Sequence, residues 1–160
     1  MEQDVSPPQL GEDGLVESDA ACIVDKVIDG DTLDCADGTR IRLLLIDSPE
    51  MGQGVFGDLA KTTLEAIAPV GMELTVYFDI ERQDRYDRTL AHLMRPDGAF
   101  VNEEMLRRGM AVVSVYPPNV TLVDRYRSIV SDAQAAKVGL WALSGFECEP
   151  SAYRRGECRD

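Results

Sequence analysis

The stretch from residue 27 to residue 50, VIDGDTLDCADGTRIRLLLIDSPE, constrains the fold of this chain most, because it mixes charges with strand-forming residues. Its 24 residues include six acidic side chains and two arginines. One of them, Arg42, stands inside the otherwise apolar run 41–46. A buried charge is expelled, neutralised, or compensated by a partner or a metal ion. The remaining sequence must indicate which of these outcomes applies.

Acidic charge is unevenly distributed along the 160 residues, whose formal net charge is −13. Residues 1–20 contain six acidic side chains, no lysine or arginine, and no helical or strand periodicity. Because such a composition disfavours a packed core, we expect residues 1–20 to form a disordered acidic leader. The remaining length suits one domain, and no apolar run approaches the roughly 20 residues of a membrane span. An acidic chain is a poor candidate for binding nucleic acid unless basic side chains gather locally.

Hydrophobic periodicity predicts the secondary structure of the rest of the chain. Alternating apolar residues predict strands over roughly 22–28, 33–35, 39–46, 73–79, 89–94 and 110–116. Apolar residues at helical spacing predict helices over roughly 56–68, over 101–108, and from about 121 until Gly139. Short strands and tight turns in the order βββαββαβα indicate an α+β fold, a five-stranded Greek-key β-barrel (OB-fold) with three helices.

Four polar motifs could carry chemistry, and each is a weak signal when taken alone. They are the turn Asp29-Gly30-Asp31, the strand end Asp47-Ser48-Pro49-Glu50, Arg42, and the charged loop 84–88. Each also has a purely structural interpretation: a turn, an approach to a helix, an arginine reaching outward, and a solvated loop. The combination is a stronger signal, because carboxylates at the ends of two different strands can meet in a small barrel.

Such carboxylates offer hard oxygen ligands without imidazole or thiolate, which favours Ca²⁺ or Mg²⁺. Adjacent arginines supply planar groups that bind phosphate. Metal, carboxylate and arginine together are what phosphodiester hydrolysis requires. A nucleophilic triad is not available, because His92 is the only histidine and falls in a predicted strand, where we expect a structural role.

The four cysteines favour an oxidising compartment, and we expect a secreted protein. A zinc site is disfavoured, because no Cys-x-x-Cys spacing occurs and the one histidine lies far from every cysteine in sequence. Cys22 and Cys35 flank the first hairpin and could face each other across it, which leaves Cys148 and Cys158 to close the tail. This is one of three pairings. No signal peptide is visible, so either the chain begins after a removed signal or the protein is cytoplasmic with free thiols.

The motifs IDGDT, RLLLIDSPE, DRYDR, VNEEMLRRGMA and GLW, in this order and spacing, resemble staphylococcal nuclease and its thermonuclease relatives. The resemblance covers roughly residues 21–143, which leaves 144–160 as a C-terminal tail. It implies an OB-fold nuclease that uses Ca²⁺ to hydrolyse DNA and RNA and leaves 3′-phosphate products. We expect a monomer without a membrane span.

The resemblance also implies roles for the acidic motif residues. Asp31 and Asp47 match the calcium carboxylates, and Ser48 occupies the position whose backbone carbonyl completes the protein's ligands. Glu50 matches the residue that activates or positions the attacking water. Asp29 precedes the metal ligand in the turn and is expected to support it without binding the ion.

A second group of matches concerns the substrate. Arg42 and Arg88 match the two arginines that hold the phosphate and stabilise charge in the transition state. Tyr86 matches a tyrosine beside the phosphate, and Tyr116 matches one on the nucleotide-binding wall. Arg85 replaces a lysine of the family, which keeps the positive charge.

The chain departs from the family pattern at three further places. Ser114 replaces a tyrosine of the base-binding wall, and the segment 51–55 is shorter than the corresponding family loop. Asp87 stands where the family has glycine, directly before Arg88, and its charge could partly occupy that arginine. None of these changes removes an expected catalytic group.

Two rival functions stay open. The first is a non-catalytic module on the same fold that binds nucleic acid or protein, for which loss of the carboxylates would be expected. The second is an extracellular calcium-binding structural domain, which the acidic composition favours. That interpretation leaves Arg42 and Arg88 unexplained.

Overall fold

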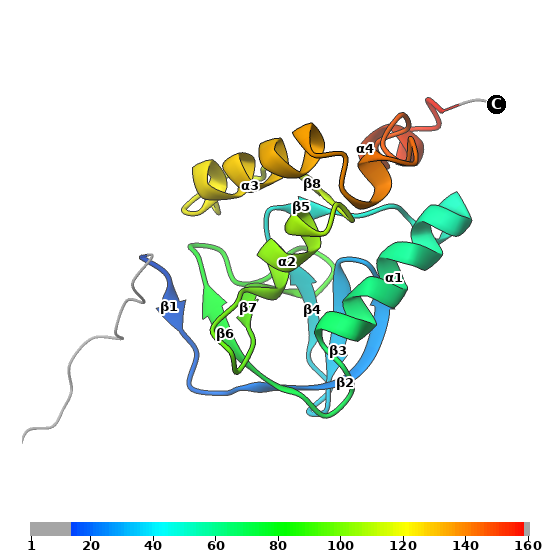
Figure 1. Cartoon of the computed structure of the whole chain (residues 1–160). Coiled ribbons are helices and arrows are strands. Elements are labelled where there is room, and N and C mark those ends of the chain that lie inside the picture. Colours follow the sequence, from blue (N-terminus) through cyan, green and yellow to red (C-terminus); the bar gives the residue numbers. More distant parts are fainter. Residues whose placement is uncertain (1–13, 159–160) are drawn as a thin grey trace, which may run out of the picture.

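The structure, a computed structural model, describes residues 14–158, and Figure 1 shows helices packed around a small β-barrel. The strands of this range are β1 (Val16–Glu17), β2 (Cys22–Asp29), β3 (Thr32–Cys35), β4 (Arg40–Leu43), β5 (Ile46–Asp47), β6 (Glu73–Phe78), β7 (Thr89–Met94) and β8 (Val112–Val113). The α-helices are α1 (Val55–Ile67), α2 (Val101–Arg107), α3 (Val123–Ala135) and α4 (Pro150–Arg154). Two 3₁₀ helices are η1 (Met51–Gln53) and η2 (Gly139–Trp141). None of the described helices combines the length and apolar character needed to span a bilayer.

Five strands close the barrel. β6 pairs with both β2 and β7, while β3 and β4 complete the circuit between β2 and β7. These pairings are antiparallel except that of β4 with β7, in which Arg42 lies opposite Leu90. The predicted α+β barrel of five strands with three long helices is therefore confirmed.

Alternate residues of the strands and one face each of α1, α2 and α3 form the core. In β6, Leu74 and Val76 point inward and are buried. In α1, Ala60, Leu64 and Ile67 recur at helical spacing and are fully buried. Burial of a side chain such as Leu64 contributes about 1.5–3 kcal/mol, so the core provides a stable frame for the loops that connect its strands.

The predicted strand over 39–46 is interrupted. β4 ends at Leu43 and β5 begins at Ile46, because Leu45 adopts a left-handed backbone conformation with φ of 67°. The Arg42 guanidinium supports this turn, since its Nη1 donates to the carbonyl of Leu43 at 2.7 Å and to that of Ile46 at 2.8 Å. A side-chain contact therefore overrides the strand propensity of the apolar run.

The predicted strand over 110–116 is also shorter than expected. Only Val112 and Val113 form β8, which pairs with β5 in a ladder separate from the barrel sheet. In this ladder Asp47 lies opposite Val112. The short ladder thereby fixes the backbone of an expected metal ligand.

The N-terminal boundary of the fold lies earlier than the sequence predicts. Of the expected leader 1–20, residues 1–13 lie outside the described residues, whereas 14–20 belong to the fold. The Leu15 side chain is in the hydrophobic core with 1% of its surface exposed, and β1 pairs with β6. One apolar side chain and one strand pairing thus anchor a segment whose acidic composition predicted disorder.

Two disulfides brace the chain. Cys22 is joined to Cys35 across the β2–β3 hairpin, with 5.2 Å between their Cα atoms. Cys148 is joined to Cys158, with 5.7 Å between their Cα atoms. These are the pairs that the sequence favours. The second disulfide closes a loop around α4, which lies on the same side of the barrel as α3 (Figure 1).

Candidate active site

The site begins where the turn between β2 and β3 meets the segment after β5. Asp31 stands directly before β3, and its Oδ2 accepts hydrogen bonds from the Ser48 N–H at 3.0 Å and the Ser48 hydroxyl at 3.2 Å. A Cβ at Gly30 would collide with the Ser48 side chain. Glycine is therefore needed here for the close approach of the two segments.

Arg42 lies between two buried aspartates. Its Nη2 is 3.5 Å from Asp31 Oδ2 and 3.5 Å from Asp47 Oδ1, and the arginine side chain is only 15% exposed. One guanidinium thus compensates two carboxylates that would be costly to bury alone. This contact accounts for an arginine within an apolar run. Because its Nη1 is engaged by backbone carbonyls, Arg42 braces the site as well as supplying charge.

An arginine from the C-terminal tail completes the arrangement. Arg154, at the end of α4, donates from Nη1 to Asp47 Oδ1 at 3.0 Å and from Nη2 to Asp47 Oδ2 at 2.6 Å. The Nη1 group also donates to Glu50 Oε2 at 2.7 Å. We refer to three carboxylates and the two arginines that contact them as the carboxylate cluster: Asp31, Asp47, Glu50, Arg42 and Arg154.

Arg154 is not among the residues that the sequence predicts for the site. The resemblance ends near residue 143, so it carries no information about the tail. A signal was nevertheless present, because Arg154 and Arg155 stand next to each other between the two cysteines of an expected disulfide. In a chain of net charge −13, two consecutive arginines in a closed loop indicate an acidic partner.

Burial and neighbouring charges shift the pKa values of the aspartates in different directions. Burial acts to raise the pKa of Asp31, but the Arg42 guanidinium and the Ser48 N–H outweigh it and bring the pKa below its usual value. Burial raises the pKa of Asp47 despite the hydrogen bonds it accepts. The pKa of Asp29 is raised to about 7, first by burial and then by the charge of Asp31. Asp31 therefore holds its negative charge most firmly.

The expected phosphate residues of loop 84–88, which we name the Tyr86 loop, form a separate group. Arg88 Nε is 2.8 Å from Asp84 Oδ2, and Arg85 Nη2 donates to the Tyr86 hydroxyl at 2.9 Å. Both guanidinium groups also lie over the Tyr86 ring, at 5.1 Å for Arg85 and 5.6 Å for Arg88. Tyr86 is 64% exposed, so this group of two cations and a ring faces solvent.

The strand register relates the Tyr86 loop to the carboxylate cluster. Arg88 directly precedes β7, and β7 runs beside β4 with Leu90 opposite Arg42. Arg88 therefore lies at the start of the strand that pairs with the one carrying Arg42. The partner of Arg88 is Asp84 rather than the adjacent Asp87, which adopts a left-handed backbone with φ of 64°.

Tyr116, the other expected substrate residue, follows β8 and is 64% exposed. The chain before it is held next to the turn between β4 and β5, since the Ser114 N–H donates to the Leu45 carbonyl at 2.9 Å. The structure thus brings five expected residues together: Asp31, Asp47, Ser48, Glu50 and Arg42. Four others lie outside this group: Arg85, Tyr86, Arg88 and Tyr116.

The oxygen atoms of the site fit a hard cation. Within residues 14–158, no group of three or more His, Cys, Asp or Glu side chains is arranged to hold a metal ion. Two aspartates and a backbone carbonyl are a smaller donor set, which requires further ligands from water or substrate. The guanidinium groups of Arg42 and Arg154 both lie against Asp47. Two cationic side chains therefore already pair with the aspartate that would hold a divalent ion.

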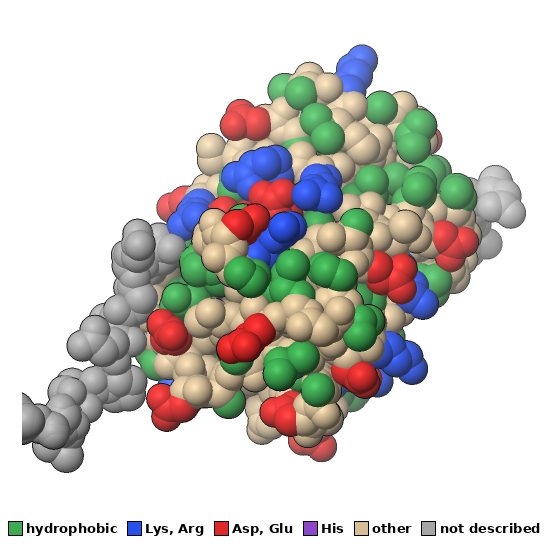
Figure 2. Space-filling view, turned by 60° about the horizontal axis from the view of Figure 1, so that its bottom comes forward, with side chains coloured by type: hydrophobic (Ala, Val, Ile, Leu, Met, Phe, Trp, Pro, Cys, Tyr) green, Lys and Arg blue, Asp and Glu red, His purple; other side chains and the backbone are tan. Residues whose placement is uncertain are grey.

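The surface of the molecule shows the same mixture of charges. In Figure 2, several basic side chains gather around acidic ones near the middle of the visible face, while other acidic side chains are scattered over the remainder. A local gathering of cations allows an acidic protein to attract a polyanion, because field strength depends on nearby charges more than on net charge.

A closed five-stranded barrel that carries buried aspartates and arginines defines a class of small OB-fold proteins with a charged site built on the barrel. The chain belongs to the family described as Staphylococcal nuclease homologue, whose sequence profile matches residues 40–143. This range is more than half of the chain and contains Arg42, Asp47 and Glu50. The resemblance found in the sequence is therefore confirmed.

Relatives with curated names include several endonucleases. The chain is 33% identical over 133 residues to "Endonuclease YncB" of Bacillus subtilis, covering 77% of this chain and 62% of the relative. It is 31% identical over 133 residues to "SPbeta prophage-derived endonuclease YokF" of the same organism, covering 77% of this chain and 44% of the relative. An "Uncharacterized endonuclease" of Haemophilus influenzae is 35% identical over 140 residues, covering 85% of this chain and 74% of the relative. The chain thus spans less than two thirds of both Bacillus subtilis proteins.

Proposed function

We propose that the protein is a secreted, calcium-dependent endonuclease that hydrolyses phosphodiester bonds of DNA and RNA and leaves 3′-phosphate products. One observation carries the proposal: three carboxylates and an arginine of the family motifs lie together in a chain whose relatives are named endonucleases. Two disulfides support an extracytoplasmic location. We further propose that the protein acts as a monomer, with residues 21–143 as the catalytic domain.

The acidic residues have distinct roles in this proposal. Asp31, Asp47 and the carbonyl of Ser48 would hold the calcium ion, which when bound would supply positive charge to the phosphate. Glu50 orients the attacking water and takes up its proton, so that the water oxygen approaches phosphorus opposite the departing oxygen. The bond to the 5′ oxygen then breaks, the departing 5′ oxygen takes a proton from solvent water, and the phosphate stays on the 3′ side.

The arginines bind the phosphate and stabilise its developing charge. Arg88 can exchange its ion pair with Asp84 for one with phosphate, because carboxylate and phosphate can each accept two hydrogen bonds from its planar guanidinium. Arg42 contributes through Nη2, since Nη1 is engaged by backbone carbonyls. Such preorganised donors account for large parts of the rate enhancement in enzymes that stabilise anionic transition states.

The exposed aromatic residues form the proposed nucleotide-binding surface. Tyr86 has two cations against its ring, and such a platform binds a phosphate and an adjacent base together. Tyr116 offers a second exposed ring beyond β8. Stacking on tyrosine tolerates any base, which suits an enzyme that acts on both DNA and RNA.

Plasmid DNA and a single-stranded RNA incubated with the purified protein in calcium, and in parallel with EDTA, test this proposal. We expect cleavage of both substrates in calcium and none in EDTA, with 3′-phosphate ends on the fragments. The Glu50→Gln variant should lose about 100-fold or more in kcat. A matched control is Glu65→Gln, an exposed acid on α1 that should keep wild-type activity.

Two outcomes would contradict the proposal. Full activity after exhaustive chelation would exclude the calcium requirement. Binding of nucleic acid without cleavage, in calcium and at neutral pH, would instead favour a non-catalytic binding module on the same fold.

A further inference from the structure

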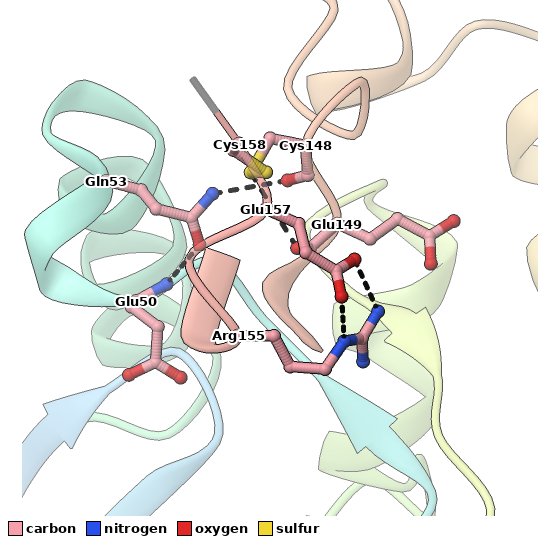
Figure 3. Close-up of a disulfide and its surroundings, with 7 residues drawn as sticks. All are labelled: Glu50, Gln53, Cys148, Glu149, Arg155, Glu157 and Cys158. Atoms are coloured by element: carbon pink, nitrogen blue, oxygen red, sulfur yellow. Dashed lines mark hydrogen bonds and ion pairs between the residues drawn. A yellow bond between two sulfur atoms is a disulfide. The ribbon is translucent and has the colours of Figure 1, made fainter. Parts of the chain in front are cut away.

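The loop closed by Cys148 and Cys158, residues 148–158, lies against the segment that carries Glu50. Gln53 joins the two, because its Nε2 donates to the Cys148 carbonyl at 3.2 Å while its Oε1 accepts from the Glu50 N–H at 2.9 Å. Figure 3 shows Gln53 between Glu50 and the disulfide. We refer to residues 148–158 as the tail loop.

Tyr153 provides a second contact between the tail loop and this segment. A Cβ at Gly52 would collide with the Tyr153 hydroxyl, so the phenol lies directly against the Gly52 backbone. The tail loop is therefore docked at two points beside Glu50, independently of any ion pair.

The two arginines of the tail loop have different partners. Arg155 forms hydrogen bonds with Glu157 inside the tail loop, at 2.7 and 3.0 Å, and its side chain is 58% exposed (Figure 3). Arg154 instead reaches both oxygens of Asp47 and one oxygen of Glu50. Asp47 is 2% exposed, whereas Arg154 is 38% exposed, so Arg154 covers Asp47 from the solvent side. Arg42 contacts the same carboxylate as the more buried of the two cations.

We propose that Arg154 is a built-in competitor of the divalent cation, held by the tail loop on the carboxylate oxygens that the cation and the attacking water require. The inference rests on the proposed calcium dependence. A carboxylate that accepts two hydrogen bonds from one guanidinium has few lone pairs left for an ion. A divalent ion and a guanidinium at the same carboxylate also repel each other. Calcium binding therefore requires Arg154 to leave Asp47.

The disulfide determines how strongly Arg154 competes. Closure of the tail loop restricts the positions of Arg154, which raises its effective concentration at Asp47. Opening the loop should allow Arg154 to spend more time away from the carboxylates. The affinity for calcium is then set by the tail as well as by the metal ligands, since competing occupants of one site reduce each other's apparent affinity.

Isothermal titration calorimetry with Ca²⁺ alone, on the full chain without nucleic acid, tests the proposal. We expect Arg154→Ala to bind calcium about tenfold more tightly than wild type, because the unliganded site no longer has to release a guanidinium. The matched control is Arg155→Ala, which removes the same charge from the same loop and should stay within about twofold of wild type. Circular dichroism confirms that each variant is folded.

A second pair of variants separates competition from simple charge. The double variant Cys148→Ser/Cys158→Ser opens the tail loop without changing the formal charge. We expect it to bind calcium about threefold more tightly than wild type. The same double change in the Arg154→Ala background should leave calcium affinity unchanged, since the competitor is already absent.

The outcomes distinguish this inference from the proposed function. If Arg154→Ala binds calcium with wild-type affinity or more weakly, while wild type still cleaves DNA in calcium, Arg154 is not a competitor and the proposed function stands. If Arg154→Ala keeps wild-type calcium affinity but cleaves DNA with a lower kcat at saturating calcium, Arg154 is instead a substrate-contacting residue. If neither protein binds calcium at about 10 mM, the calcium dependence and the competitor fail together.

Discussion

The two arginines expected to hold phosphate occupy different environments, Arg42 within β4 and Arg88 in the loop directly before β7. Arg42 is 15% exposed and touches two buried aspartates and two backbone carbonyls. Arg88 is 32% exposed and pairs with an aspartate of its own loop. The same chemical role can therefore be built in two ways. A buried arginine is fixed by the fold and also stabilises it, whereas an arginine in a solvent-facing loop can change partners at little cost.

Removal of Arg42 should have the largest effect, because it breaks the fold and the site together. Arg42→Ala removes the guanidinium partner of buried Asp31 and leaves Asp47 with Arg154 alone, and removing one member of a buried ion pair costs about 3–5 kcal/mol. We expect this loss in the free energy of unfolding by urea, together with loss of cleavage. The control is Arg40→Ala, an exposed arginine of the same strand paired with Asp34, which should lose less than about 1 kcal/mol.

Removal of Arg88 should separate activity from stability. Arg88→Ala should lower kcat by about 10²–10³, the loss seen when one donor to a transition-state oxyanion is removed. Its ion pair with Asp84 is partly exposed, so the free energy of unfolding should change by less than about 1 kcal/mol. The control for activity is Arg107→Ala, which removes a partly exposed ion pair with Glu104 in α2. Equal losses in the free energy of unfolding of the Arg88 and Arg42 variants would show that Arg42 does not stabilise the fold more than Arg88 does.

The pH dependence of stability tests whether burial at the site disfavours the charged form of Asp29. The pKa of Asp29 is about 7 in the fold and 3.8 as a free side chain, so its contribution is complete below about 3.8 and is lost as pH rises through about 7. Asp29→Asn removes this loss and keeps an acceptor for the Asp31 N–H. In EDTA the variant should gain about 1–3 kcal/mol relative to wild type at pH 8 compared with pH 4.

Asp25→Asn provides the control for this measurement, because Asp25 is an exposed residue of the same strand. Its difference from wild type should be the same at both pH values. An Asp29→Asn variant that behaves like this control would mean that burial of Asp29 does not disfavour its charged form. The buried Asp29 carboxylate would then tolerate its negative charge as well as an exposed carboxylate does.

The smallest effect is expected at the exposed ring. Tyr86→Ala should raise KM for single-stranded DNA by about tenfold, because base stacking on an aromatic side chain contributes about 1–3 kcal/mol. Stability should be unchanged, since Tyr86 is 64% exposed. Tyr86→Phe keeps the ring and should match wild type within about twofold. A Phe variant as weak as the Ala variant would assign the role to the hydroxyl, which accepts from Arg85.

Local patterns predicted most of the fold, because alternation and helical spacing report which faces are buried. They failed where a side chain distant in sequence determines the backbone conformation. The apolar run 41–46 predicts one strand. In the structure, however, Arg42 and Asn102 donate hydrogen bonds to carbonyls within this run, and Asn102 Nδ2 lies 3.0 Å from the Leu44 carbonyl. Such a turn depends on a contact across 58 residues of sequence, which periodicity does not record.

The site could be predicted as far as the family motifs extend. Asp31, Asp47 and Arg42 lie together as their positions in the motifs imply. Arg154 could not be predicted in the same way, since its contact with Asp47 joins residues 107 positions apart and lies beyond the motifs. The type of residue at a motif position carries information about chemistry, whereas a contact of the tail depends on how the whole chain folds.

The pairing of β1 with β6 has a consequence for self-association. β6 ends in Tyr77 and Phe78, and β1 covers the backbone of both residues on the side away from β7. An uncovered strand edge presents free N–H and C=O groups that can pair with another chain. A protein shortened to begin at residue 21 would lose Leu15 from the core and expose this edge. The few residues before β2 therefore keep the barrel from adding strands of its neighbours.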